Sequence, residues 1–433
     1  MNVSDSERVA TLLVADGFEI TRNESAADVV LLNTCSVREK AEHKLFTRVG
    51  QINKSAADRT EKKPVLGILG CVAQLEGETL FGKSPAIDFV LGTKAVGRVS
   101  QAIDNAFAGE KYFTDLGERD EIYDWTVAEA QRNSPYIAFV PIIEGCNKFC
   151  TYCIVPFSRG REKSLPASEI VRHLLKLRGE GVKEVHLIGQ NVNSYRPKTD
   201  DGLEAFPGAT QFSRLLRAVA ATGIERIKFT TSFPRDFHPD IVEAINEHEN
   251  LCNWVHLPVQ SGSNRILKLM RRGHTIENYL ERIDKIKNSP RCISLTTDII
   301  VGFPGETEGD FQATLDLAEY CKFNFAYYFK YSPRPGTPAF EMSDNVSSEE
   351  KTERFLRLDK LIRSHQQPVF RNYLNKTVDV LAEKVSEKNP NQISGHTTCQ
   401  MVVNFEGAAD LLGKIIKVKI LESKANTLYG KIS

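Results

Sequence analysis

The feature of this sequence that most constrains its fold is a regular alternation of short apolar runs and amphipathic stretches from residue 136 onward. Apolar runs that alternate with helical stretches predict a parallel β-sheet with helices on its outer side. Six strand–helix units of this kind predict an α/β domain built as a partial (β/α)6 barrel. The predicted strands cover residues 136–143, 184–188, 226–231, 254–259, 294–301 and 324–331, and the predicted helices cover residues 168–178, 213–221, 239–246, 276–287 and 308–321.

Polar segments follow five of the predicted strands. In complete β/α barrels the chemistry lies at the carboxyl ends of the strands, because the loops at that end meet around one opening. We therefore expect an active site among these polar loops. The segments are residues 146–153, 189–191, 232–234, 260–263 and 302–306.

Three cysteines lie close together in the first of these segments. Cys146, Cys150 and Cys153 have C-x3-C-x2-C spacing. A loop this short can bind three irons of one [4Fe–4S] cluster, which leaves the fourth iron open for a substrate or cofactor. A structural zinc site requires four ligands, a ferredoxin loop contains a further cysteine, and no fourth cysteine or histidine lies nearby in the sequence. The polar neighbours of the cysteines also disfavour a group of buried structural thiols.

The region before the barrel predicts a smaller α/β domain. Its continuous apolar runs are typical of buried parallel strands, and residues 4–15 have the pattern of a helix with a serine and an acid at its start. The region therefore begins on a helix, with no strand in front of it. Residues 110–134 are polar and acidic and predict a linker. The apolar runs cover residues 28–32, 64–69 and 87–91.

The region after the barrel predicts a helix followed by a small β domain. Residues 347–365 place Phe355, Leu358 and Ile362 on one face of a helix. Four short strands are predicted at residues 378–382, 398–404, 414–421 and 427–432. The expected domains cover residues 1–110, 132–368 and 371–433.

The composition is that of a globular protein that works in a reducing compartment. The chain has 433 residues, 41% of them hydrophobic and 26% charged, which predicts two or three domains. No run approaches the ~20 apolar residues of a membrane span, and the polar start is not that of a signal peptide. Nine cysteines form no regular disulfide framework, so we expect a cytoplasmic protein. We also expect a monomer. The balance of 56 basic and 56 acidic residues gives no overall signal for nucleic acid.

Five further segments, together with the cysteine loop, resemble the radical S-adenosylmethionine (SAM) methylthiotransferases. In the cysteine loop, Tyr152 stands directly before the last cysteine, as an aromatic residue does in radical SAM enzymes. The similarity covers essentially the whole chain, including a C-terminal TRAM domain. The five segments are residues 33–41, 67–74, 155–162, 256–263 and 297–306.

The resemblance implies methylthiolation of carbon 2 of the isopentenylated adenosine that lies 3′ to the anticodon of tRNA. It implies a radical SAM [4Fe–4S] cluster on Cys146, Cys150 and Cys153. It also implies two SAM molecules, of which one donates a methyl group and the other is the source of a 5′-deoxyadenosyl radical. The implied partners are tRNA and a reductant such as flavodoxin or ferredoxin. The implied fold is an N-terminal α/β methylthiotransferase domain, a central partial (β/α)6 radical SAM barrel and a C-terminal β (TRAM) domain that binds RNA.

Cys35 and Cys71 each follow a predicted strand of the N-terminal region. Two cysteines at equivalent strand ends either meet at one edge of a parallel sheet or are two small buried thiols. The resemblance implies that they bind an auxiliary [4Fe–4S] cluster with a third cysteine, which ends an opening strand just before a Met-Asn pair. Because Met1 and Asn2 begin this sequence, we expect that strand and that cysteine to be missing. We therefore hypothesise impaired sulfur insertion, which eight irons on two stable clusters after reconstitution would refute.

Polar residues after the second and fourth predicted strands are candidate SAM contacts. Gln190 and Asn191 occupy the place where radical SAM enzymes contact the SAM amino group, although they also suit polar caps of the next segment. Gln260 and Ser261 resemble family residues near SAM, although they also suit a simple strand-exit turn. With Tyr152, these residues form the predicted cofactor-binding set.

The remaining candidate functional residues are two groups of basic residues and several isolated histidines and cysteines. Two basic groups either contact RNA phosphates or form solvated charged faces. His186 and His256 lie inside predicted strands, so we expect their side chains to pack in the core. We expect four other cysteines to be buried structural thiols. The basic groups are Arg159, Arg161 and Lys163, and Arg271, Arg272 and His274, and the four cysteines are Cys252, Cys292, Cys321 and Cys399.

Two alternative functions stay open on the sequence. One is methylthiolation of another acceptor, either threonylcarbamoyl-adenosine in tRNA or an aspartate of a ribosomal protein, although residues 36–40 favour the isopentenyladenosine branch. The other is a non-catalytic iron–sulfur protein that binds RNA without cleaving SAM. Mass spectrometry of tRNA from a deletion strain separates the acceptors, and formation of 5′-deoxyadenosine with dithionite separates the enzyme from the binding protein.

Overall fold

The computed structural model describes residues 1–36, 39–57, 63–117, 127–387 and 389–433. Val37 and Arg38 of the family segment 33–41, and residues 118–126 of the predicted linker, lie outside the described residues. The chain divides into two compact units. The first contains Met1–Asn133, Glu144–Phe149 and Cys153–Glu162, and the second contains Ser134–Ile143, Cys150–Tyr152 and Lys163–Ser433.

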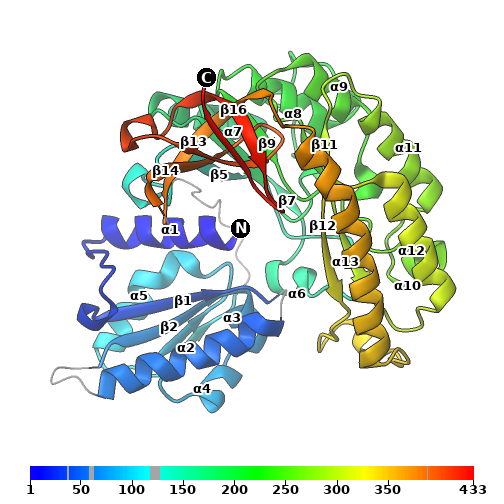
Figure 1. The fold of residues 1–433 in the computed structure, drawn as a ribbon. Helices are drawn as coiled ribbons and strands as arrows, with labels where there is room; N and C mark the ends of the chain where they lie inside the picture. The colour runs from blue at the N-terminus through cyan, green and yellow to red at the C-terminus, as the bar shows by residue number, and fades with distance from the viewer. Residues whose placement is uncertain (37–38, 58–62, 118–126, 388) are drawn as a thin grey trace. The chain divides into compact units, whose positions relative to one another are not determined.

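The first unit is built on a parallel four-stranded sheet in the order β1-β2-β3-β4 (Figure 1). The three strands that the apolar runs predict are confirmed as β1, β2 and β3. The expected linker is wrong at β4, which pairs with β3 in register. Three residues are too few to show a periodic pattern, so only the pairing reveals this strand. The strands are β1 (Val29–Thr34), β2 (Val65–Gly70), β3 (Phe89–Leu91) and β4 (Phe113–Asp115).

Helices cover both faces of this sheet. Side chains of a strand alternate between the two faces, so Val65 and Leu69 of β2 pack with α1 and α5, whereas Leu66 and Ile68 pack with α2 and α4. The helix predicted at residues 4–15 is confirmed as α1. The helices are α1 (Asn2–Ala15), α2 (Glu39–Ala57), α3 (Cys71–Glu76), α4 (Thr79–Lys83), α5 (Val99–Phe107) and α6 (Val155–Arg159), with short 3-10 helices η1 (Glu24–Ala26), η2 (Val96–Arg98) and η3 (Glu129–Gln131).

The second unit contains the six parallel strands that the alternation predicts. They form two three-stranded sheets, β5-β8-β9 and β10-β11-β12. A parallel bridge between Ile227 and Leu251 links β9 to the segment before β10, which supports the predicted partial barrel. The strands are β5 (Ile137–Pro141), β8 (Glu184–Ile188), β9 (Arg226–Phe229), β10 (Trp254–His256), β11 (Ser294–Val301) and β12 (Phe325–Lys330), and two short strands, β6 (Ile143–Glu144) and β7 (Lys163–Ser164), flank the cysteine loop in the sequence.

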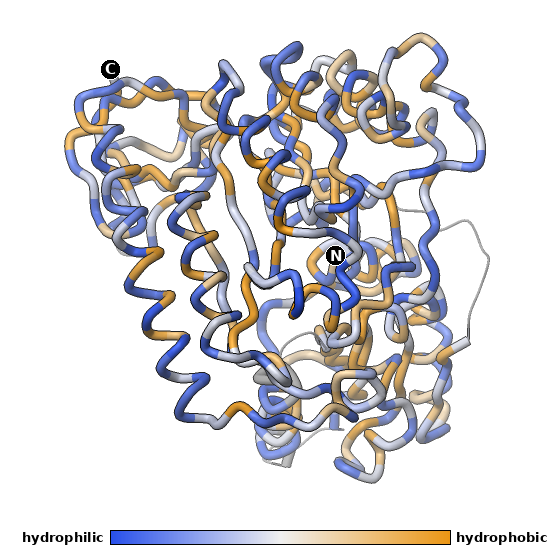
Figure 2. Tube along the Cα trace, turned by 90° about the vertical axis from the view of Figure 1, so that its right-hand side faces the viewer, coloured by the Kyte–Doolittle hydropathy of each residue, from blue (hydrophilic) through white to orange (hydrophobic). Residues whose placement is uncertain are grey.

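Helices follow these strands and bury one apolar face each. In α7, for example, Ile170, Leu174 and Leu177 are buried at helical spacing and join the main core with the strands. Figure 2 shows this alternation of hydrophobic and hydrophilic residues along the helices. All five helices predicted between the strands and the helix predicted at residues 347–365 are confirmed, and α10 is an additional one. They are α7 (Ala167–Gly179), α8 (Gln211–Ala220), α9 (Asp240–Glu247), α10 (Asn264–Leu269), α11 (Ile276–Lys287), α12 (Glu308–Cys321) and α13 (Ser348–Arg371), with η4 (Val192–Ser194), η5 (Pro234–Asp236) and η6 (Pro338–Glu341).

The last part of the second unit is a closed five-stranded barrel in the order β13-β14-β15-β17-β16. The sequence pattern predicts only four strands. It misses β14 because most of its side chains are polar, and Ile393 is its one buried apolar side chain. Because the barrel is closed, the backbone of β14 pairs with β13 and β15 even though its side chains are mostly polar. The elements are β13 (Thr377–Ser386), β14 (Asn389–His396), β15 (Val402–Glu406), η7 (Ala409–Leu411), β16 (Ile415–Ser423) and β17 (Leu428–Ile432).

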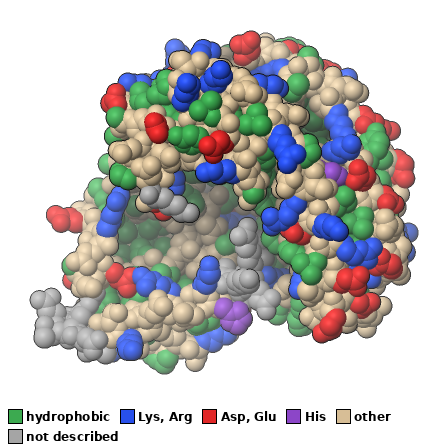
Figure 3. Space-filling model, in the orientation of Figure 1, with side chains coloured by type: hydrophobic (Ala, Val, Ile, Leu, Met, Phe, Trp, Pro, Cys, Tyr) green, Lys and Arg blue, Asp and Glu red, His purple; other side chains and the backbone are tan. Residues whose placement is uncertain are grey.

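Charge on the molecular surface follows the balanced composition. On the face shown in Figure 3, Lys and Arg side chains are interspersed with Asp and Glu. Within the described residues, the longest helices are too polar to span a lipid bilayer.

Candidate active site

Cys146 follows β6 in a tight turn of the first unit. Its backbone N–H donates to the Gly160 carbonyl oxygen across 3.1 Å. Gly145 has a φ of +78°, and a Cβ atom there would lie 2.1 Å from the Arg161 carbonyl oxygen. Only glycine allows the backbone on either side of the cysteine loop to approach this closely. Cys146 is buried in this turn and Cys153 is half-buried.

Cys150 lies in the part of the loop that belongs to the second unit. The next residue, Thr151, donates its backbone N–H to the Met270 carbonyl (3.1 Å) and its hydroxyl to the Leu269 carbonyl (2.9 Å). The Thr151 carbonyl accepts from the Ala339 N–H (2.8 Å). These bonds fix the backbone next to Cys150 against the end of α10.

The donor set of the loop fits three corners of an iron–sulfur cube. All three loop cysteines are present as thiols. Nowhere in the described ranges do three His, Cys, Asp or Glu side chains gather as ligands of a single metal ion do. A [4Fe–4S] cube binds each of its cysteine ligands to a different iron, so three thiols on one short loop are a suitable donor set for such a cluster.

Cys35 directly follows β1, and Cys71 directly follows β2. The two strands are parallel, with Thr34 opposite Gly70, so both cysteines leave the sheet at the same edge, as we expected. Cys71 is buried and Cys35 is half-buried. Burial raises the pKa of the Cys71 thiol. Two cysteines thus follow neighbouring strands at one edge of the sheet.

Arg159, the last residue of α6, is buried beside Cys71. Its guanidinium pairs with Asp5 at 2.5 Å and with Glu144 at 3.4 Å, and its positive charge favours the thiolate form of Cys71. The two roles predicted for Arg159 were contact with an RNA phosphate and membership of a solvated charged face. Both are wrong, because its guanidinium is buried and is already paired with Asp5 and Glu144. The other two basic residues of its group, Arg161 and Lys163, are exposed.

The second basic group is also divided by burial. Arg271 is exposed, whereas Arg272 and His274 are buried. Arg272 contacts Cys150 and Tyr152 of the cysteine loop, so a solvated charged face is wrong for this residue too. Burial lowers the pKa of His274 to about 4, which keeps its imidazole neutral near pH 7.

The predicted SAM contacts lie at the carboxyl ends of their strands. Gln190 follows β8, and its side-chain oxygen is buried without a hydrogen-bond partner among the described residues. Asn191 precedes η4 but its side chain does not cap it. Ser232, which follows β9, also has a buried hydroxyl without such a partner. Buried polar atoms require partners, so these strand ends suit a polar ligand such as the SAM amino acid moiety.

Gln260 and Ser261 form the exit from the fourth strand. Gln260 has a φ of +77°, and its backbone pairs with β11, donating to the Asp298 carbonyl at 2.9 Å. The Ser261 hydroxyl is fully buried and accepts from the Ser263 N–H at 3.2 Å. These contacts are those of the strand-exit turn that we weighed against SAM binding.

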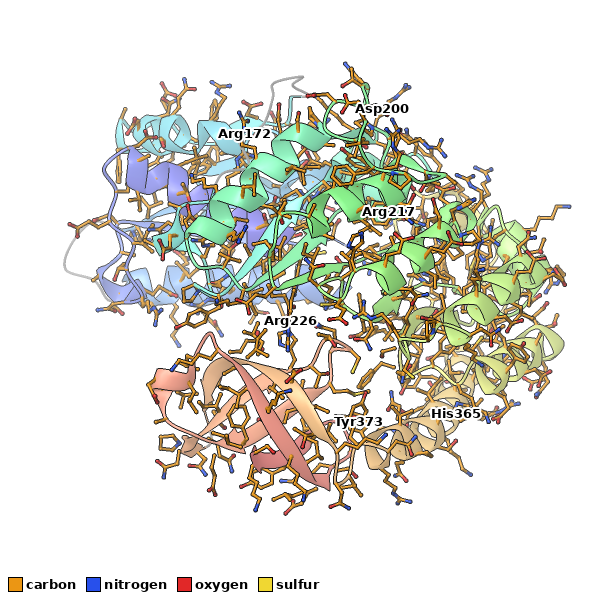
Figure 4. The ribbon with its side chains drawn as sticks, turned by 90° about the horizontal axis from the view of Figure 1, so that it is seen from above. Arg172, Asp200, Arg217, Arg226, His365 and Tyr373 are labelled. Carbon is orange, nitrogen blue, oxygen red and sulfur yellow. The ribbon has the colours of Figure 1, made fainter. Side chains whose placement is uncertain are left out.

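The histidines inside the strands belong to polar networks that the sequence pattern does not reveal. His186 contacts the Phe139 ring and the Glu184 carboxylate, and the carboxylate also binds His396 of the C-terminal barrel. Arg226 points to the same barrel and donates to the His396 carbonyl at 2.8 Å (Figure 4). His256 packs on Trp254 and hydrogen-bonds Thr296. The predicted packing is confirmed, but the packed side chains also carry hydrogen bonds.

The remaining cysteines are mostly as predicted. Cys252, Cys321 and Cys399 are buried. Cys292 is exposed, so the prediction of a buried thiol is wrong at this position. It lies in a turn with a φ of +48° between α11 and β11, where a lone cysteine gives no signal of its burial.

Three family models together match most of the chain. The model of the radical SAM superfamily matches residues 140–318, the model of the uncharacterized protein family UPF0004 matches residues 1–92, and that of the TRAM domain matches residues 371–433. Proteins named tRNA-2-methylthio-N(6)-dimethylallyladenosine synthase are also similar. The protein from Alteromonas mediterranea is 41% identical over 435 residues, covering 100% of this chain and 89% of the relative. The protein from Aquifex aeolicus is 41% identical over 437 residues, covering 100% and 96%.

Solved structures support the same fold. The radical SAM methyltransferase TsrM from Kitasatospora setae, with tryptophan and a SAM analogue bound, matches 78% of this chain and 72% of its own chain with a TM-score of 0.57 and 13% identity. Such a low identity shows the fold alone. Because the full-length relatives are 41% identical and their similarity runs through all three matched domains, the chain belongs to the radical SAM methylthiotransferase family.

Proposed function

We propose that this chain methylthiolates carbon 2 of the isopentenylated adenosine 3′ to the anticodon of tRNA. The observation that carries the proposal is the 41% identity over the whole chain to proteins named for this reaction. The cysteine loop and the cysteine pair at the N-terminal sheet edge supply the sulfur ligands that such chemistry needs. The TRAM domain and the named relatives support tRNA as the substrate.

In this proposal Cys146, Cys150 and Cys153 hold a [4Fe–4S] cluster. When bound, the cluster supplies the electron that cleaves a SAM sulfonium and so yields a 5′-deoxyadenosyl radical. The hydrogen on carbon 2 of adenine is not acidic, and this carbon bears no leaving group, so a radical route avoids slow polar chemistry. The protein's part is to bind, orient and exclude water around the cofactor. The reducing electron would come from flavodoxin or ferredoxin.

Side chains at the strand ends would orient SAM. Gln190 and Asn191 after β8 would bind its amino group, and the buried amide oxygen of Gln190 supports this role because it otherwise lacks a partner among the described residues. Tyr152, Gln260 and Ser261 complete the proposed set, although the Ser261 hydroxyl is already used within its turn. A Gln190→Leu variant should raise the KM for SAM with little change in iron content.

Cys35 and Cys71 would hold the auxiliary [4Fe–4S] cluster. Their shared sheet edge supports this role, and Arg159 supports it further because its buried guanidinium supplies positive charge beside Cys71. The third cysteine ligand that the resemblance implies stays a prediction. Iron and sulfide analysis of anaerobically reconstituted protein tests both sites. The Cys150→Ala variant should lose about one cluster's iron, and the Cys35→Ala variant should lose the iron that the parent binds in excess of one cluster.

The target base would leave its stack to reach the interior of the partial barrel. Extrusion of a base costs roughly a few kcal/mol, and less in a loop whose bases are already splayed. The decisive experiment is mass spectrometry of tRNA from a deletion strain complemented with this chain. Return of methylthio-isopentenyladenosine supports the proposal. Return of a methylthio group on threonylcarbamoyl-adenosine, or a deletion strain whose tRNA profile is unchanged by the deletion, overturns it.

A further inference from the structure

Arg272 lies just beyond the end of α10 and is only 5% exposed. Its Nη1 atom lies 3.5 Å from the Cys150 Sγ atom and 3.3 Å from the Tyr152 hydroxyl oxygen. Its Nη2 atom donates to the Pro258 carbonyl oxygen at 2.7 Å. The centre of the guanidinium lies 4.4 Å from the ring centroid of Phe233. A buried cation is therefore held against a cysteine of the radical SAM motif.

The backbone holds this side chain in place from two directions. The Arg272 N–H donates to the Leu267 carbonyl at 3.0 Å, which ties it to α10. Arg271 and Gly273, on either side, have φ values of +53° and +65°, so the chain turns sharply there and directs alternate side chains inward. Thr151 binds the same helix end through two hydrogen bonds. Thr151, which follows Cys150, and Arg272 are thus fixed to one helix end.

The contacts of Arg272 suit a hydrogen bond from its guanidinium to the Cys150 sulfur atom. An arginine stays cationic at any pH of interest and presents its donors in a rigid plane. The Pro258 carbonyl and the Phe233 ring set the orientation of that plane. A cysteine bound to iron is a thiolate, so Nη1 would donate a charge-assisted hydrogen bond to it.

We propose that Arg272 is a positioning residue that orients Cys150 and raises the reduction potential of the cluster bound there. This inference rests on the proposed cluster site. One-electron reduction by a low-potential donor such as dithionite adds one negative charge to the cluster. A hydrogen bond and a cation at a ligating sulfur stabilise that added charge, so their loss makes reduction harder.

The test uses the full chain with Cys35→Ala and Cys71→Ala, so that a single cluster contributes to the signal. Arg272→Gln removes the charge, Arg272→Lys keeps the charge without the planar fork, and Arg271→Gln changes the exposed neighbour as a matched control. Each protein is reconstituted anaerobically, its iron is counted, and the midpoint potential is measured by a redox titration followed by electron paramagnetic resonance.

We expect Arg272→Gln to lower the equilibrium constant for one-electron reduction by about tenfold, which is a midpoint about 59 mV more negative. Arg272→Lys should fall between this value and the control, and the control should match the parent. If Arg272→Gln does not retain four irons, the Arg272→Lys midpoint decides in its place. Equal midpoints in all proteins, or a change confined to the KM for SAM, would overturn the inference.

Iron content and midpoint potential distinguish a missing cluster site from a missing role of Arg272. A parent protein that binds no iron overturns the proposed cluster site and the inference with it. A parent protein with four irons and a reducible cluster upholds the site, and the Arg272 variants then judge the inference alone.

Discussion

His396 connects the C-terminal barrel to the radical SAM strands through a buried carboxylate. Its Nε2 atom lies 3.0 and 2.9 Å from the two oxygens of Glu184, and its Nδ1 atom lies 3.1 Å from a Glu383 oxygen. Glu184 is completely buried and also binds His186 at 2.6 Å. The charge on His396 therefore balances a carboxylate that water cannot reach.

Protonated His396 should stabilise this contact by about 3 kcal/mol. Burial alone would lower its pKa, but the hydrogen bonds that the imidazolium donates to Glu184 and Glu383 outweigh burial and raise the pKa to about 9. The difference from the ordinary value of about 6.5, at about 1.4 kcal/mol for each pKa unit, gives this free energy. Because the folded-state pKa is raised, the stabilisation is complete below about pH 6.5 and is lost as the pH rises through about 9.

Urea unfolding of the wild type and of His396→Gln at several pH values measures this effect. Trp254 reports on the unit that contains both barrels if Trp125, the other tryptophan, is replaced by phenylalanine in both proteins. The wild type should exceed the variant in unfolding free energy by about 3 kcal/mol at pH 6.5, and this excess should shrink to under about 1 kcal/mol at pH 10. Comparing two proteins at each pH cancels the titration of other groups.

The matched control is Glu383→Gln. The Glu383 side chain is 37% exposed, so its pairing with His396 should contribute under about 1 kcal/mol. A difference between wild type and His396→Gln that stays constant or grows as the pH rises would refute the assigned charge state of His396. A loss with Glu383→Gln as large as that with His396→Gln would show that the buried carboxylate of Glu184 is not the main partner.

Three further predictions concern single residues. Gly145→Ala should lower the iron bound per chain by about half or more, because its Cβ would meet the Arg161 carbonyl at 2.1 Å; full iron content in a colorimetric assay contradicts this. Thr307→Ala removes the N-cap of α12 and should cost about 1 kcal/mol in urea unfolding, most of which Thr307→Ser should restore. Exposed Cys292 should react with iodoacetamide about tenfold or more faster than Cys252, whose pKa is raised by burial, and similar rates by peptide mass spectrometry would contradict the assigned exposures.

Strands and helices with a clear local pattern were predictable from the sequence. β2 is a continuous apolar run that is buried along its whole length, and α7 shows helical spacing of its buried side chains. β4 and β14 escaped prediction for opposite reasons. β4 is too short to show a period, and β14 is too polar to resemble a strand, so only pairing with neighbouring strands defines them.

The cysteines of the candidate site were also predictable from local features of the sequence. The spacing of Cys146, Cys150 and Cys153 is a local property, and the position of Cys35 and Cys71 after two apolar runs places them at one sheet edge once the strands are parallel. Such features can be predicted from the sequence because each depends on residues that are close together in the chain.

The sequence by itself determined most of the strands and helices and the spacing of the cysteines, since these follow from periodicity and spacing over short stretches. Only the tertiary structure decided which charged side chains are buried and what they contact. Arg272 is 122 residues from Cys150, and His396 is 212 residues from Glu184. A buried arginine or histidine looks the same in a sequence as an exposed one, because the partners that offset its desolvation come from distant segments that meet only when the chain has folded.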